Sequence, residues 1–104
     1  MDERERALDA AHRHAAGFLE SLDDRPVWPR ASLDEMVAAF GGPLAEEGLD
    51  PAAVVDEIAE RADPGLVAIP GGRFFGFVIG GTHPAALAAD WLVSAWDQNS
   101  GRHC

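Results

Sequence analysis

The chain has 104 residues, the length of one small domain, and 47% of them are hydrophobic, as expected of a globular protein. Eighteen acidic residues against eight basic ones give a formal net charge of −10, which argues against nucleic acids and anionic membrane surfaces as partners. All eight basic residues are arginines, so the chain contains no lysine. The single cysteine, Cys104, permits no internal disulfide, and we expect a cytoplasmic protein without a membrane span.

Residues 2–22 have the pattern of an amphipathic helix. Its apolar residues recur at alternating intervals of three and four, which is a heptad seam: Leu8, Ala11, Ala15, Phe18 and Leu22. A helix of this length is marginally stable alone in water, so the seam must pack on something. The segment 23–29, DDRPVWP, then breaks the helix with two prolines and leaves Trp28 on an extended stretch.

Two shorter helices are predicted next from their terminal residues. Ser32 with Glu35 three positions later is a capping box, and the helix that follows it ends at Gly41-Gly42-Pro43. Asp50 is the expected N-cap of a third helix, with Pro51 at its first position. This helix should extend to Asp63-Pro64.

The last forty residues predict two short extended segments and one helix. GLVAI (65–69) and RFFGFVI (73–79) are apolar and β-branched or aromatic, and Pro70-Gly71-Gly72 separates them as a turn. Thr82 or His83 should cap a helix that starts at Pro84 and runs to residue 99. This helix is apolar on most of its surface, which predicts burial between layers. The expected fold class is therefore mainly α with one or two short extended segments.

Histidines and acidic residues on the predicted helices offer little catalytic chemistry. His12 and His14 are two positions apart, so they point to different faces of a helix and cannot chelate one metal ion together. Asp56, Glu57 and Glu60 have no nucleophile to pair with, and a solvated helix face is the better interpretation. We predict no metal site and no catalytic residue from these patterns.

His83 in the stretch GGTHPAAL is the polar residue with the clearest functional alternative. It stands at a predicted helix N-terminus, where exposed N–H groups favour anions, although a helix cap that contacts only solvent is the favoured interpretation. His103 and Cys104 could bind a metal ion, but two adjacent residues are a weak signal.

The run RFFGFVIGGTHPAALAADWLVSAWDQN resembles the amino-terminal segment of the group II pyridoxal-phosphate-dependent amino-acid decarboxylases, the family of the aromatic-L-amino-acid and glutamate decarboxylases. The order and spacing of Arg73-Phe74-Phe75, Gly80-Gly81 and Ala89-Asp90 carry the resemblance, which extends with weaker motifs over residues 8–99. Gly71-Gly72 stand where many members of the family carry His-Pro.

The resemblance implies the amino-terminal portion of a fold-type I enzyme, which is α/β when complete. Residues 1–64 would then form a helical dimerisation arm, and residues 65–104 the substrate-entrance strand and the start of a helix leading into the large domain. Phe75, Phe77, Gly80 and His83 would line or flank the substrate pocket. Some relatives place a threonine at the position of Gly80, so no hydroxyl contact to substrate is expected here.

The implied function is a contribution to dimerisation and to the pocket walls of a carboxy-lyase that acts on an amino acid. Pyridoxal phosphate requires a lysine as its Schiff-base partner, and this chain has none, so we expect it neither to bind the cofactor covalently nor to catalyse the reaction alone. The alternative is a stand-alone helical interaction module that dimerises through the heptad seam and the tryptophan-containing helix. The expected partners are a second subunit and an amino-acid substrate.

Overall fold

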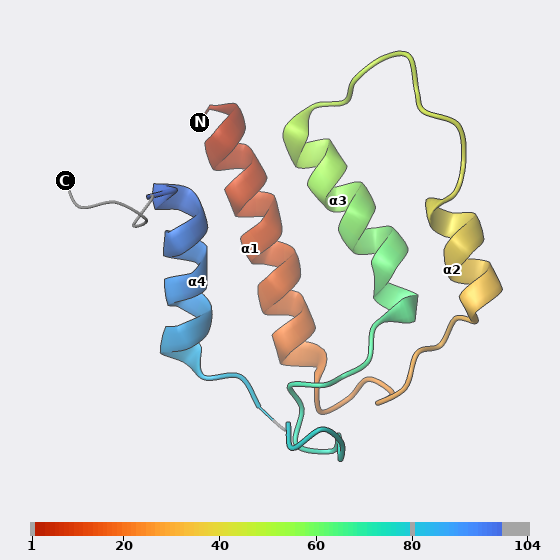
Figure 1. The fold of residues 1–104 in the computed structure, drawn as a ribbon, viewed down its shortest axis with the longest axis vertical. Helices are drawn as coiled ribbons and strands as arrows, with labels where there is room; N and C mark the ends of the chain where they lie inside the picture. The colour runs from red at the N-terminus through yellow and green to blue at the C-terminus, as the bar shows by residue number, and fades with distance from the viewer. Residues whose placement is uncertain (1, 80, 99–104) are drawn as a thin grey trace.

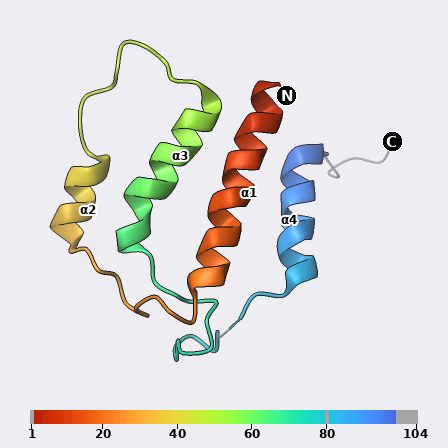
Figure 2. The same ribbon diagram turned by 180° about the vertical axis from the view of Figure 1, so that it is seen from behind.

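A computed structural model describes residues 2–79 and 81–98 of the chain. It is mainly α-helical, and this part of the chain contains no β-strand. The elements are α1 (Glu3–Ser21), α2 (Leu33–Phe40), α3 (Pro51–Ala62), the short 3-10 helix η1 (Asp63–Gly65) and α4 (Pro84–Trp96). The four α-helices lie side by side in one layer in the order α4, α1, α3, α2, as Figure 1 and the reverse view in Figure 2 show.

The starts of α2 and α4 confirm the predicted capping signals, and α1 begins with a cap that was not predicted from the sequence. Asp2 precedes α1 and its carboxylate accepts a hydrogen bond from the Glu5 backbone N–H at 2.9 Å. Ser32 and Glu35 form the complete capping box of α2, with distances of 3.0 and 3.1 Å. Of the two candidates for α4, it is His83 that caps the helix, because its Nδ1 accepts from the Ala85 N–H at 3.2 Å.

Asp50 is the exception among the caps. It occupies the N-cap position of α3, as predicted, but its side chain makes no capping hydrogen bond. Its carboxylate instead lies 3.4 Å from the guanidinium of Arg6 on α1. A contact between two helices has therefore replaced the local one.

Helix α1 lies between α3 and α4 and presents a different face to each (Figure 1). Ala10, one of four buried residues in the described ranges, lies on α1, and its small side chain allows α1 and α3 to approach closely. On the other side, the ring of His12 meets Trp91 of α4 edge-on, with 6.3 Å between centroids. His12 and His14 do point to different faces, as their spacing predicted. Of the predicted heptad seam, Leu8 is exposed and the other four residues are half-buried.

The segment that follows η1 is hydrogen-bonded to the residues that immediately follow α1. The Ala68 N–H donates to the Val27 carbonyl at 2.9 Å, and the Arg73 guanidinium donates to the carbonyls of Leu22 and Arg25. Phe74 is buried and packs edge-on against Trp28, with ring centroids 5.9 Å apart.

The expectation of an extended segment at 73–79 is wrong. The Ile79 N–H bonds back to the Gly76 carbonyl at 3.0 Å, so the chain makes a tight turn with a single isolated bridge in place of a strand. Phe77 and Val78 have φ angles of 52° and 57°, in the left-handed region. Apolar, β-branched composition predicted a strand, but in the described chain no neighbouring strand is present to pair with it.

The predicted burial of α4 between layers is also wrong for this chain. Only Leu87 and Trp91 are half-buried on α4, against α1, and the remaining residues of the helix are exposed. The reason is the single-layer arrangement, because nothing in the described ranges covers the outer face of α4 (Figure 2). Within those ranges, no helix is long and apolar enough to cross a membrane.

Candidate functional site

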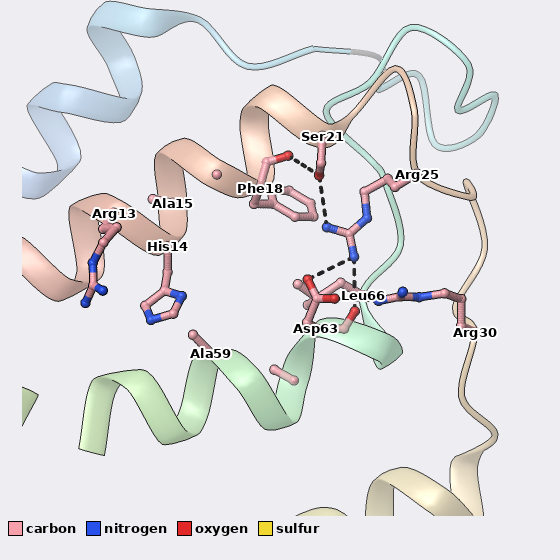
Figure 3. A pocket seen from close by; sticks show the side chains of 12 residues that line it. Arg13, His14, Ala15, Phe18, Ser21, Arg25, Arg30, Ala59, Asp63 and Leu66 are labelled. Atoms are coloured by element: carbon pink, nitrogen blue, oxygen red, sulfur yellow. Dashed lines mark hydrogen bonds and ion pairs between the residues drawn. The ribbon is translucent and has the colours of Figure 1, made fainter. Parts of the chain in front are cut away.

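A cleft of about 560 Å³ opens between α1, α3 and the segment after α1 (Figure 3). Its walls combine aliphatic and aromatic side chains with a group of charged ones. It is lined by Arg13, His14, Ala15, Gly17, Phe18, Ser21, Arg25, Arg30, Ala59, Ala62, Asp63 and Leu66.

Asp63 is the centre of the charged group at one end of the cleft. One carboxylate oxygen lies 3.1 Å from Arg25 Nη2, and the other accepts from Arg30 Nη2. Arg25 also donates to the Asp63 carbonyl at 3.1 Å and to Ser21 Oγ at 3.2 Å. Its guanidinium lies 4.7 Å over the Phe18 ring, a cation–π contact, and only 10% of its side chain is exposed. Arg25 is therefore held in one orientation by four contacts with three residues, Phe18, Ser21 and Asp63.

Asp56 is the centre of a second charged group towards the other end. Its Oδ1 atom lies 2.7 Å from His14 Nε2 and 3.0 Å from Arg13 Nη2. The hydrogen bond from His14 is the main cause that lowers the pKa of Asp56 below its ordinary value of 3.8, and the charge of Arg13 acts in the same direction. The carboxylate is thus ionised at neutral pH.

Sequence reasoning missed both charged groups, although their spacing contains a signal. His14, Phe18, Ser21 and Arg25 recur at intervals of four, three and four, which places the first three on one stripe of α1. Asp56, Ala59 and Asp63 recur in the same way along α3 and its C-cap. The Asp56 side chain is 38% exposed, so the face is partly solvated as predicted, but its pairing with Arg13 and His14 of α1 was not predicted.

Among the described residues, the cleft shows no catalytic constellation. The Ser21 hydroxyl donates to the Phe18 carbonyl at 2.7 Å and accepts from Arg25, so no general base activates it as a nucleophile. Among the described residues, no group of three histidine, cysteine or acidic side chains is placed to hold a metal ion. His103 and Cys104 lie outside the described residues.

The residues that the resemblance assigned to a substrate pocket do not form one within the described chain. Phe75 and Phe77 project from the 73–79 turn with 92% and 86% of their surface exposed, and neither lines the cleft. His83 is exposed and occupied in capping α4. Gly80 lies outside the described residues.

The residues present do not fit pyridoxal phosphate as a covalently held cofactor. The sequence has no lysine, so no side-chain amine is available to form a Schiff base with the cofactor aldehyde. Any such lysine has to be supplied by another segment or subunit.

Comparison with protein-family models, with curated proteins and with solved structures gives no match for this chain.

Proposed function

We propose that the chain is the helical arm of a cytoplasmic group II pyridoxal-phosphate-dependent amino-acid decarboxylase. In this role it docks on a second subunit and contributes walls to the pocket for an amino-acid substrate, while the lysine-bearing subunit body performs the decarboxylation. The proposal joins the motif resemblance of residues 73–99 to one property of the structure, the surface that the chain leaves uncovered.

The uncovered surface is the observation that carries the proposal. The accessible area is 8372 Å². A compact monomer of the same mass would expose about 5,700 Å². The radius of gyration is 16.5 Å, against about 13 Å for a compact domain of this length. The excess of about 2,700 Å² is larger than the roughly 800 Å² that each partner gives to a standard protein–protein interface.

The exposed apolar residues lie where an arm would need them. On α4, large parts of Leu92, Val93 and Trp96 are exposed, and on the 73–79 turn the side chains of Phe75 and Phe77 are almost fully exposed. Exposed apolar surfaces larger than those of ordinary monomers are characteristic of interaction sites. Aromatic side chains that project from a turn can enter a pocket of a neighbouring subunit, which is the role that the resemblance gives to these two phenylalanines.

The test is the behaviour of the purified chain in solution. A docking arm should bind a hydrophobic dye, associate without a fixed stoichiometry in light scattering, and co-elute with a lysine-bearing decarboxylase body that lacks its own amino-terminal helices. Val93→Asp should reduce both dye binding and co-elution. Leu44→Asp is the matched control, because Leu44 is also exposed but lies on the 41–50 loop at the far edge of the layer.

A cooperative thermal transition with a discrete dimer, and no binding to the decarboxylase body, would instead identify the chain as a stand-alone interaction module. Most of the heptad seam is not the surface that such a module would use, because all of its residues except Leu8 are already half-buried within the chain. The exposed outer face of α4 is the surface through which such a module would dimerise.

A further inference from the structure

The cleft between α1 and α3 has a local excess of positive charge in a strongly acidic chain. Arg25 and Arg30 share the one carboxylate of Asp63, so this end of the cleft has a charge of +1. At the other end, Arg13 and Asp56 neutralise each other when His14 is uncharged. The whole chain has a formal charge of −10, so this is a localised exception.

Arg30 has side-chain N–H groups that donate to no protein acceptor in the described ranges, whereas the guanidinium of Arg25 is fixed by its contacts within the chain. A guanidinium has five N–H groups, and the only protein acceptor of Arg30 side-chain donors in the described ranges is Asp63 Oδ2. The Arg30 side chain is 54% exposed at the rim of the cleft. Arg25 is held behind it, next to Phe18, and supplies fixed positive charge.

The wall beside the two arginines is apolar. Phe18, Leu66, Ala59 and Ala62 line the cleft between its charged ends, and its volume of about 560 Å³ is within the range of small-molecule sites, about 300–1,000 Å³. One charged anchor and an apolar wall together select an amphipathic anion.

We infer that this cleft binds a small organic monocarboxylate through Arg30, with the apolar body of the ligand against Phe18 and Leu66. A guanidinium fork matches a carboxylate in two parallel hydrogen bonds. A single negative charge neutralises the +1 excess, whereas a phosphate dianion would leave a net negative charge inside an acidic chain. The inference concerns a surface away from α4 and the 73–79 turn and does not depend on the proposed function.

The test is a titration of the full chain with benzoate, followed by NMR of the arginine Nε–Hε groups and the leucine methyl groups. Saturable shifts of Arg30 and Leu66 are expected, with a Kd on the order of millimolar for a ligand of this size. Benzamide, which has the same shape without the charge, should produce no saturable shift. Sodium chloride at matched ionic strength controls for screening.

Arg30→Gln should weaken benzoate binding about tenfold or more, since it removes a charge-assisted pair of hydrogen bonds. Arg61→Gln is the matched control, because Arg61 is similarly exposed (48%) and ion-paired with Glu57 but lies outside the cleft, and it should bind benzoate like the wild type. The inference is overturned if wild type shows no saturable shift up to about 50 mM benzoate, if benzamide binds equally well, or if inorganic phosphate produces the same shifts as tightly. If Arg30→Gln does not fold, the comparison of benzoate with benzamide on the wild-type chain still tests whether binding requires the negative charge of the ligand.

Discussion

Replacement of Asp63 by alanine tests whether the charged group around this residue stabilises the fold. The substitution removes the carboxylate that Arg25 and Arg30 share, and leaves the guanidinium of Arg25 largely buried without its counter-ion. The bonds from Arg25 to the Asp63 carbonyl and to Ser21 are independent of the lost carboxylate. We therefore expect the substitution to lower the free energy of unfolding, but by less than if the buried guanidinium of Arg25 had lost all of its hydrogen-bond partners.

The magnitude follows from the exposure of each pair. A charge-assisted hydrogen bond contributes about 1.5–3 kcal/mol where it is buried. The Asp63 side chain is 46% exposed, which reduces the contribution of the Arg25 pair through solvent screening. The exposed Arg30 pair adds about 0.2–1 kcal/mol. We expect Asp63→Ala to lower the free energy of unfolding by about 2 kcal/mol in total.

Urea unfolding followed by circular dichroism at 222 nm measures this loss, and at a slope of about 1–2 kcal/mol/M it appears as a shift of about 1–2 M in the midpoint. Glu57→Ala is the control, because it removes an ion pair with Arg61 within one exposed helix, for which about 0.3–0.5 kcal/mol is expected. If the two variants lose the same small amount, Asp63 has no stabilising role beyond that of an ordinary surface ion pair.

Three further predictions use the same unfolding measurement. The pKa of Asp56 is lowered in the folded chain, so the ionised carboxylate contributes to folding stability above the unfolded pKa of 3.8, and this contribution is lost as the pH falls through the folded pKa. Acidification from pH 6 to pH 3 should therefore lower the stability of the wild type more than that of Asp56→Asn. An equal loss in both proteins would contradict the pairing of Asp56 with His14. Ser32→Ala removes the capping box of α2 and should cost about 1 kcal/mol, and an unchanged midpoint would show that the box contributes nothing. Val78→Gly should stabilise the chain by about 0.5–1 kcal/mol because glycine adopts the positive φ angle without strain, whereas destabilisation would show that Val78 is needed as a side chain.

The local signals in the sequence were sufficient for the helices. The acceptor in each confirmed cap is two or three residues from its donor, so Ser32 and His83 could be assigned from the sequence. The cap of α1 at Asp2 is equally local, but it was not assigned from the sequence. Asp50 shows where this reasoning ends, because its carboxylate is directed to Arg6, forty-four residues away.

The candidate site was not accessible to the same reasoning. The cleft depends on Arg25 and Asp63, which are thirty-eight residues apart, and on the close packing of α1 against α3. Helical spacing shows that His14 and Phe18 share a stripe of α1, but not which other helix faces that stripe. The error at 73–79 has a similar cause, because strand-forming residues become a strand only where a partner strand is present.

The sequence by itself determined the number of helices, most of their ends, the acidic charge and the absence of a lysine, because each of these depends on composition or on residues within one turn of each other. Only the tertiary structure decided that α1 lies between α3 and α4. It also decided that the carboxylates of Asp56 and Asp63 pair with three arginines around a cleft. The exposure of the apolar residues of α4 and of Phe75 and Phe77 was likewise decided by the tertiary structure. These features depend on which surfaces of distant segments meet, and a periodic pattern specifies the face of a helix without specifying its neighbour.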